Sequence, residues 1–303
     1  MTANSGLGDS MFRGSIVALV TPFTDGGEVD HAALDGLVEF HLEQGSDGLV
    51  IAGTTGESAT LTRQEFRELL QAVVRRVNGV VPVLAGTGSA ATTVAVEQSR
   101  QAAELGADGL LVVTPYYNRP PQSGLEAHFT AVAEAVNLPL VLYNVPSRTA
   151  VDLLPATVAR LAAHPRIVGI KEAKRQPGRV EELVALCGDG FTVLSGDDPS
   201  CLSAMQSGAR GVVSVAANVA PAQMHQLCSL AAAGDWATAR SLDQRLQLLF
   251  EALAVETNPI PVKWALFELS RVGPQIRLPL TPLDEALRGP LRRCLETLGL
   301  LRA

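Results

Sequence analysis

Lys171 follows a short apolar run that reads Ile-Val-Gly-Ile from position 167. An ammonium buried without a partner is so costly that such a lysine tends to lose its proton and become a nucleophile. A neutral lysine amine attacks a 2-oxo acid to form an imine, which activates the adjacent carbon as an enamine. Lys171 is therefore the candidate nucleophile. The sequence leaves one alternative open, a core lysine paired with a carboxylate such as Glu172.

Imine formation also needs a group that moves protons to and from the carbinolamine, and a tyrosine hydroxyl can do this. Tyr143 lies near the end of another apolar run, residues 139–146, and is the candidate acid and base. Thr55 and Tyr117 would complete a relay of hydroxyl groups. Taken singly, each of these residues is equally consistent with packing or capping.

Two further segments are suited to binding carboxylates. The run Gly53-Thr-Thr-Gly-Glu57 offers hydroxyl groups and backbone donors before a predicted helix. Arg148 carries a planar guanidinium that matches a second carboxylate bidentately. Taken alone, the run at 53–57 is equally typical of an ordinary turn, and Arg148 is equally typical of an arginine on the surface.

Eight apolar runs recur along the chain and predict the elements that hold these residues. They are rich in Val, Ile and Leu, which is typical of parallel strands buried on both faces. The segments between these runs have apolar residues at helical spacing, for example over residues 64–77, 92–105 and 123–136. This alternation predicts an α/β fold, a (β/α)8 TIM barrel. The runs are residues 15–22, 48–53, 81–88, 109–115, 139–146, 167–173, 191–198 and 211–218.

The chain is expected to divide into three parts. Residues 1–11 are small and polar and predict a disordered or extended tail, residues 12–233 form the barrel, and residues 234–303 form a C-terminal helical extension that caps the barrel or packs in an oligomer. Working residues of such barrels come from the carboxyl ends of strands. The polar residues there, including Asn144, Glu172 and Ser195, are expected to converge on one mouth.

Composition narrows the possible partners and cofactors. The chain has 303 residues, 47% of them hydrophobic, and a net charge of −7 without any basic run, which disfavours nucleic acid. The sequence contains no long apolar segment of the kind that predicts membrane association. The four cysteines are far apart, which fits a reducing cytoplasm. Scattered histidines and the lack of a full dinucleotide fingerprint predict chemistry without a metal or cofactor.

Five segments together resemble the dihydrodipicolinate synthase family, a branch of the pyruvate-dependent class I aldolases that includes N-acetylneuraminate lyase. The likeness runs from about Phe12 to the last predicted helix, and a sixth segment, Asn-Pro-Ile-Pro-Val-Lys at 258–263, is also similar. The five are Gly-Thr-Thr-Gly-Glu-Ser at 53–58, Thr-Pro-Tyr-Tyr-Asn at 114–118, Tyr-Asn-Val-Pro-Ser-Arg at 143–148, Gly-Ile-Lys-Glu-Ala at 169–173 and Ser-Gly-Asp-Asp at 195–198.

The resemblance implies condensation of pyruvate with L-aspartate 4-semialdehyde on the route to diaminopimelate and lysine. It assigns the pyruvate imine to Lys171, acid–base catalysis to Tyr143 and a proton relay to Thr55 and Tyr117. Further assignments are the pyruvate carboxylate to Thr54 and Thr55, the entrance for the semialdehyde to Arg148, and substrate binding to Gly196 and Val213. It also implies that Tyr117 reaches into a neighbouring subunit, so that the chain is a homodimer or homotetramer.

Two alternatives to synthase activity remain. The same barrel and lysine imine serve enzymes that cleave sialic acid or sugar acids, although that branch usually lacks Arg148. A non-catalytic protein that senses a 2-oxo acid is the other alternative.

Feedback inhibition by lysine is expected to be weak or absent. Regulated members of the family tend to show His, Asn and Glu where this chain has Phe66, Ala90 and Val94, although Ser58 and Tyr116 remain.

Overall fold

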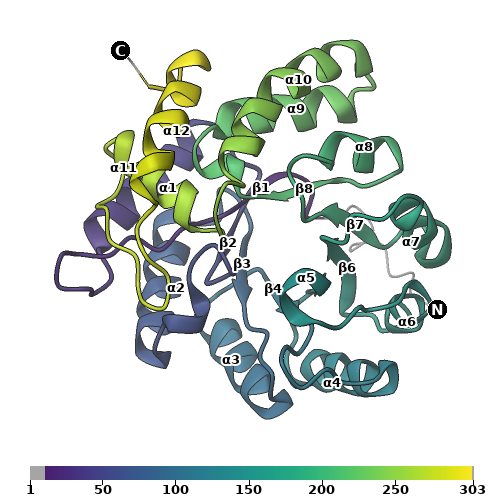
Figure 1. Cartoon of the computed structure of the whole chain (residues 1–303). Coiled ribbons are helices and arrows are strands. Elements are labelled where there is room, and N and C mark those ends of the chain that lie inside the picture. The colour runs from purple at the N-terminus through teal and green to yellow at the C-terminus, as the bar shows by residue number, and fades with distance from the viewer. Residues whose placement is uncertain (1–10, 302–303) are drawn as a thin grey trace.

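The computed structural model describes residues 11–301, so the predicted tail over residues 1–11 lies, except for Met11, outside the described residues. Eight parallel strands close into a barrel in chain order, which confirms the predicted (β/α)8 fold (Figure 1). The strands are β1 (Gly14–Ala18), β2 (Gly48–Ile51), β3 (Val83–Gly86), β4 (Gly109–Val113), β5 (Leu140–Asn144), β6 (Ile167–Glu172), β7 (Thr192–Ser195) and β8 (Gly211–Ser214).

Apolar residues fill both sides of the strands, as expected for parallel strands buried on both faces. The smaller core lies inside the barrel and the larger one lies between the strands and the surrounding helices. Successive side chains of a strand point to opposite faces, and the two cores alternate accordingly along β1, where Ile16 belongs to the inner core and Val17 to the outer one. The inner core also contains Val50, Leu84, Leu111, Val141, Leu194 and Val213.

The register between β5 and β6 shifts by one residue near the start of the two strands. Leu140 pairs with Ile167, but the next residue, Val141, pairs with Gly169. The sixth strand therefore contains one residue more than its neighbour over this stretch, as in a β-bulge.

Helices surround the barrel in Figure 1. One of them, α2, begins at a capping box in which Thr62 and Glu65 each accept from the other's backbone N–H. The helices up to the eighth strand are α1 (His31–Glu43), α2 (Arg63–Val77), α3 (Thr92–Glu104), α4 (Gln122–Ala135), α5 (Pro146–Thr149), α6 (Pro155–Leu161), α7 (Arg179–Cys187) and α8 (Cys201–Gln206), with a 3-10 turn η1 (Ser58–Thr60).

A second 3-10 turn, η2 (Ala216–Asn218), and α9 (Pro221–Ala232) follow the last strand. Three helices then form the C-terminal part: α10 (Trp236–Ala252), α11 (Ile260–Glu268) and α12 (Glu285–Thr297). The first packs along α9, and all three lie on one side of the barrel in Figure 1. The predicted boundary between residues 233 and 234 falls between α9 and α10, and its status as a domain boundary stays a prediction.

The observed strands are shorter than the predicted runs at their carboxyl ends. The second run was predicted through residue 53, whereas β2 ends at Ile51. Polar and glycine residues there leave the hydrogen-bonded ladder and form the loops of the mouth. No helix within residues 11–301 is long and apolar enough to span a lipid bilayer.

Candidate active site

Lys171 and Tyr143 lie side by side at the carboxyl ends of β6 and β5. They are register partners, and the Lys171 Nζ atom lies 4.2 Å from the centre of the Tyr143 ring. Their exposed fractions are 6% and 7%. Within the described part of the chain, Lys171 forms no ion pair. A lysine in this setting, beside a phenol, fits the predicted nucleophile and its acid–base partner.

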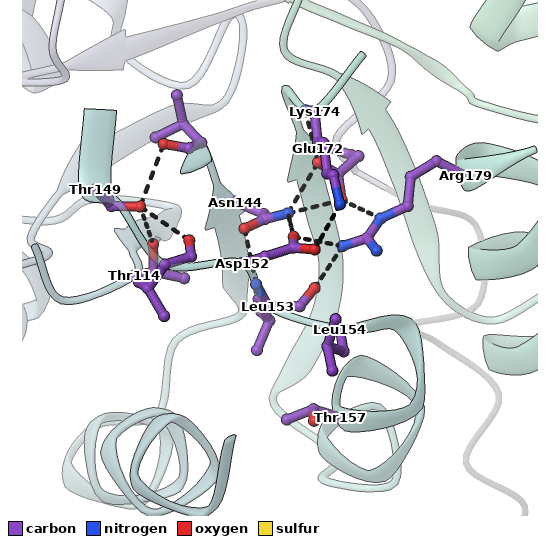
Figure 2. A network of polar contacts seen from close by, with 12 residues as sticks. Thr114, Asn144, Thr149, Asp152, Leu153, Leu154, Thr157, Glu172, Lys174 and Arg179 are labelled. Carbon is purple, nitrogen blue, oxygen red and sulfur yellow. Dashed lines mark hydrogen bonds and ion pairs between the residues drawn. The ribbon is translucent and has the colours of Figure 1, made fainter. Parts of the chain in front are cut away.

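Glu172 faces away from the barrel interior, because neighbouring side chains of a strand alternate between faces. Its carboxylate pairs with Arg179 of α7, whose Nε atom donates at 3.0 Å to Glu172 Oε2 (Figure 2). The alternative in which Glu172 neutralises Lys171 is therefore excluded. The expectation that Asn144 and Glu172 converge on the mouth is also wrong, since both belong to this outer network.

The outer network is closed by one amide. Asn144 Nδ2 donates to Glu172 at 3.0 Å and to Asp152 at 2.8 Å, and Arg179 Nη2 donates to Asp152 at 3.0 Å (Figure 2). Lys174 completes the network through its Nζ atom, 2.8 Å from Asp152 Oδ2. Burial raises the pKa of Glu172, while Arg179 opposes that rise. Two carboxylates and two cations thus hold the strand ends that carry Tyr143 and Lys171.

Gly196 leaves room for the lysine side chain. A Cβ atom at this position would lie 2.8 Å from Ala173 Cβ and 3.0 Å from Lys171 Cε. Such distances are too short for carbon atoms, so any larger residue would displace the amine. The predicted role of Gly196 in substrate binding stays a prediction.

Thr54 and Thr55 form part of a turn after β2 that suits a carboxylate. The turn's own hydrogen bonds use the N–H groups of Glu57 and Ser58, which donate to Thr54 and Gly53. Neither threonine's backbone N–H has an acceptor among residues 11–301. Adjacent free N–H groups and hydroxyls form an anion cradle.

These groups meet in one cavity of about 450 Å³ at the mouth of the barrel. Arg148, exposed at the rim, lines both this cavity and an adjoining one of about 390 Å³. A site of this size fits two small substrates. The larger cavity is lined by, among others, Thr54, Thr55, Tyr143, Arg148, Lys171, Gly196, Asp198 and Asn258.

Asp198 is a buried carboxyl at the edge of this cavity. Its Oδ2 atom accepts from the backbone N–H groups of Val215 and Ala216, at 3.0 and 2.8 Å. Burial raises the pKa of Asp198. The contact ties the loop after β7 to the loop after β8.

Two predicted site residues lie outside the cavity lining. Val213 belongs to the inner core with Tyr143. Tyr117 is 95% exposed and holds a left-handed backbone conformation with φ of +73°. A bulky residue in that conformation is strained.

Two residues that bring the extension to the mouth, Asn258 and Lys263, had no predicted role. Asn258 Nδ2 donates to Thr55 Oγ1 at 3.0 Å, and Lys263 Nζ lies 2.5 Å from Glu57 Oε1. The only sequence sign of these contacts was the similar segment at 258–263. No group of three or more His, Cys, Asp or Glu residues within 11–301 is placed to hold a metal ion.

The fold and the site together define a class of protein, a (β/α)8-barrel lyase with a buried lysine at its mouth. Comparison with known proteins agrees with this class. The model of the dihydrodipicolinate synthetase family matches residues 11–298, so the chain belongs to that family.

Individual relatives match over nearly the whole chain. The 4-hydroxy-tetrahydrodipicolinate synthase of Halorhodospira halophila is 51% identical over 96% of this chain and 98% of its own. That of Methylococcus capsulatus is 52% identical over 96% and 100%. The structure of the chloride-inhibited dihydrodipicolinate synthase from Acinetobacter baumannii, complexed with pyruvate, matches with a TM-score of 0.94 and 47% identity over 95% of this chain and 99% of that one.

Proposed function

We propose that this chain is a 4-hydroxy-tetrahydrodipicolinate synthase, which condenses pyruvate with L-aspartate 4-semialdehyde in the biosynthesis of diaminopimelate and lysine. The observation that carries the proposal is the position of Lys171, buried at the mouth, clear of Glu172 and in contact with Tyr143. The relatives named above carry the same activity in their names.

The chemistry begins when the Lys171 amine attacks C2 of pyruvate. Loss of water from the carbinolamine gives a protonated imine, and loss of a proton from C3 gives an enamine. The enamine carbon attacks the aldehyde of the second substrate and forms the new carbon–carbon bond. The amino group of that substrate then attacks C2, closes the ring and releases Lys171 as a free amine.

Each predicted residue has a role in these reaction steps. Tyr143 acts as general acid and base at the carbinolamine, and Thr55 with Tyr117 carries protons between it and solvent. Thr54 and Thr55 hold the pyruvate carboxylate through the free N–H groups of their turn. Arg148 binds the carboxylate of the semialdehyde.

Two substrate-binding residues act through shape. Gly196 leaves the space that the lysine and its imine occupy. Val213 belongs to the apolar inner core to which Tyr143 also contributes.

Exposure of Tyr117 supports a homo-oligomer, with a dimer as the minimum and a tetramer as the fuller assembly. A tyrosine side chain that is 95% exposed in one chain is a good candidate for an interface contact. The proposed relay is complete only when a second chain brings its Tyr117 to Thr55. Sedimentation velocity of the wild type and of Tyr117→Phe measures the assembly.

Arg148 favours the synthase over a sugar-acid lyase, because it places a cation at the rim where a second carboxylate enters. Coupled turnover with aspartate semialdehyde, compared with N-acetylneuraminate and 2-keto-3-deoxygluconate, separates the two. Borohydride reduction in the presence of pyruvate, followed by mass mapping, separates both from a non-catalytic sensor. An adduct on Lys171 supports the enzyme, and its absence supports the sensor.

The surroundings of the adjoining cavity support weak lysine inhibition or none. Phe66, which stands where regulated relatives tend to have histidine, is buried and lines this cavity together with Ser58 and Tyr116. An apolar side chain there cannot accept a hydrogen bond from the inhibitor's ammonium.

A cytoplasmic location is part of the proposal. All four cysteines, Cys187, Cys201, Cys228 and Cys294, are free thiols in the structure. Free thiols that are partly or fully buried suit a reducing compartment.

A further inference from the structure

Asn258 connects two groups of the proposed site that follow different strands, Thr55 after β2 and Arg148 in α5 after β5. It lies in the segment between α10 and α11, at the start of the similar stretch 258–263. Its side-chain Nδ2 donates to Thr55 Oγ1 at 3.0 Å, and its backbone carbonyl accepts from Arg148 Nη2 at 3.2 Å. One residue of the C-terminal part therefore contacts both the proton relay and the second carboxylate site.

The contact with Thr55 gives its hydroxyl a direction. A threonine hydroxyl has one proton to donate and two lone pairs that accept. Asn258 occupies one lone pair, and the Thr55 side chain has no other hydrogen bond within the described range. The Thr55 proton is therefore free to be donated into the cavity that Tyr143 and Lys171 line.

The segment that carries Asn258 is fixed to the same turn that carries Thr55. Lys263 and Glu57, both buried, form an ion pair at 2.5 Å. The other oxygen of Glu57 accepts from the backbone N–H of Arg277 at 3.0 Å, so two parts of the extension hold one carboxylate. Glu57 itself has a left-handed backbone, with φ of +55°, which the ion pair helps to maintain.

The amide of Asn258 is not fully satisfied. Its Oδ1 atom is inaccessible to solvent and has no partner among residues 11–301. Buried acceptors without partners are destabilising, and native proteins keep few of them. A side chain selected for stability alone would avoid this atom, which points to a role in function.

We infer that Asn258 is a positioning residue: its side chain orients the Thr55 hydroxyl for proton transfer, and its backbone carbonyl holds the Arg148 guanidinium at the entrance. This inference rests on the proposed function and adds a residue from outside the barrel to its machinery. The segment 258–263 is thus a part of the active site.

A double-mutant cycle tests the inference. The rate of imine formation is followed by trapping the pyruvate adduct with borohydride in wild type, Asn258→Ala, Thr55→Val and the double variant. Asn258→Ala is expected to slow trapping about 10- to 100-fold, because misplacement of a catalytic group has effects of this size. In the Thr55→Val background the same change is expected to have less than about a twofold effect, because the group it orients is gone.

Asn258→Asp is the second variant, since it keeps the shape of the side chain but cannot donate to Thr55. It is expected to slow trapping, because a carboxylate has no hydrogen to donate to the Thr55 oxygen. Gln247→Ala is the matched control: this amide of α10 donates to the Pro199 carbonyl at the mouth without contacting Thr55 or Arg148. It is expected to leave trapping unchanged.

The outcomes distinguish a failure of this inference from a failure of the proposed function. If wild type forms no adduct on Lys171, the proposed function fails. If wild type forms the adduct but the effects of Asn258→Ala and Thr55→Val multiply, the positioning role is overturned. Equal losses in Asn258→Asp and Gln247→Ala overturn it as well.

Discussion

The Nζ atom of Lys171 lies 4.2 Å from the centre of the Tyr143 ring, across one register pair of β5 and β6. The phenol therefore neighbours the amine whose proposed imine chemistry needs a proton donor. The contact is with the ring, so the contributions of the ring and of the hydroxyl can be separated by substitution.

Tyr143→Phe keeps the ring beside Lys171 and removes only the hydroxyl. We expect turnover to fall by roughly 10²- to 10⁴-fold, the usual contribution of a general acid–base group. The thermal midpoint is expected to change little, since packing in the inner core is preserved. Steady-state kinetics and calorimetry measure the two effects, and a variant with near wild-type turnover would remove Tyr143 from the mechanism.

Gly196→Ala places a Cβ atom 3.0 Å from Lys171 Cε and 2.8 Å from Ala173 Cβ. Overpacking of this kind costs about 1–3 kcal/mol, and we expect it to displace the amine and prevent adduct formation. Gly36→Ala is the matched control, because that position in α1 has open space around the added carbon. It is expected to stabilise the fold by about 0.5–1 kcal/mol through helix propensity. Chemical denaturation and borohydride trapping test both variants.

Arg179→Met removes a cation from the outer network and leaves Glu172 and Asp152 without it. Breaking a buried ion pair in this way costs about 3–5 kcal/mol. Because burial already raises the pKa of Glu172, the variant is expected to recover stability as the pH falls and the carboxyl takes up a proton. Urea denaturation at several pH values checks this. Equal destabilisation at acidic and neutral pH would show that the charge of Glu172 is not the cause.

Two buried histidines predict loss of stability in acid. Burial lowers the pKa of His41 to about 3 and that of His128 to about 4, whereas an unfolded histidine has a pKa of about 6.5. The unfolded chain therefore binds more protons below pH 6.5, and each contribution is complete above that pH and is lost towards the folded pKa.

Between pH 8 and pH 5 each histidine is expected to remove about 2 kcal/mol, because one pKa unit corresponds to 1.36 kcal/mol. Urea denaturation of the wild type at these two pH values measures the sum. His128→Gln is expected to reduce the difference between the two pH values by about half. An unchanged difference in that variant would assign the acid sensitivity to other groups.

Free lysine is expected to leave the activity almost unchanged at millimolar concentration. The reason is the apolar Phe66 in the adjoining cavity, together with the apolar residues Ala90 and Val94 around the start of α3. A coupled assay with increasing lysine checks the expectation, and Phe66→His tests whether one imidazole restores sensitivity. Half-inhibition of the wild type below 1 mM would contradict it, because a dissociation constant of 1 mM corresponds to a binding free energy of roughly 4 kcal/mol.

The barrel could be predicted from the sequence because the information lies in short segments. Apolar runs of four to eight residues predict strands, and a lysine directly after such a run predicts a buried amine. The alternation of strand side chains explains why Lys171 enters the site while Glu172 turns outward. The sequence did not decide between these faces, since the phase depends on the register between β5 and β6.

Contacts between distant segments could not be predicted in this way. Asn258 and Thr55 are 203 residues apart in the sequence, and Glu57 meets Lys263 across 206 residues. Neither pairing leaves a local pattern. Arg179 was missed for a related reason: an arginine at the start of a helix reads as exposed, and only the assembled network shows it buried against two acids.

The register shift in β6 after Leu140 determines that the Lys171 side chain points to the inner face of the barrel. If the same residues paired without this shift, Ile170 would lie opposite Tyr143 and Lys171 opposite Asn144, on the outer face of the strand. A chain that kept every reactive group but paired regularly from Leu140 onward would therefore hold the amine outside the barrel.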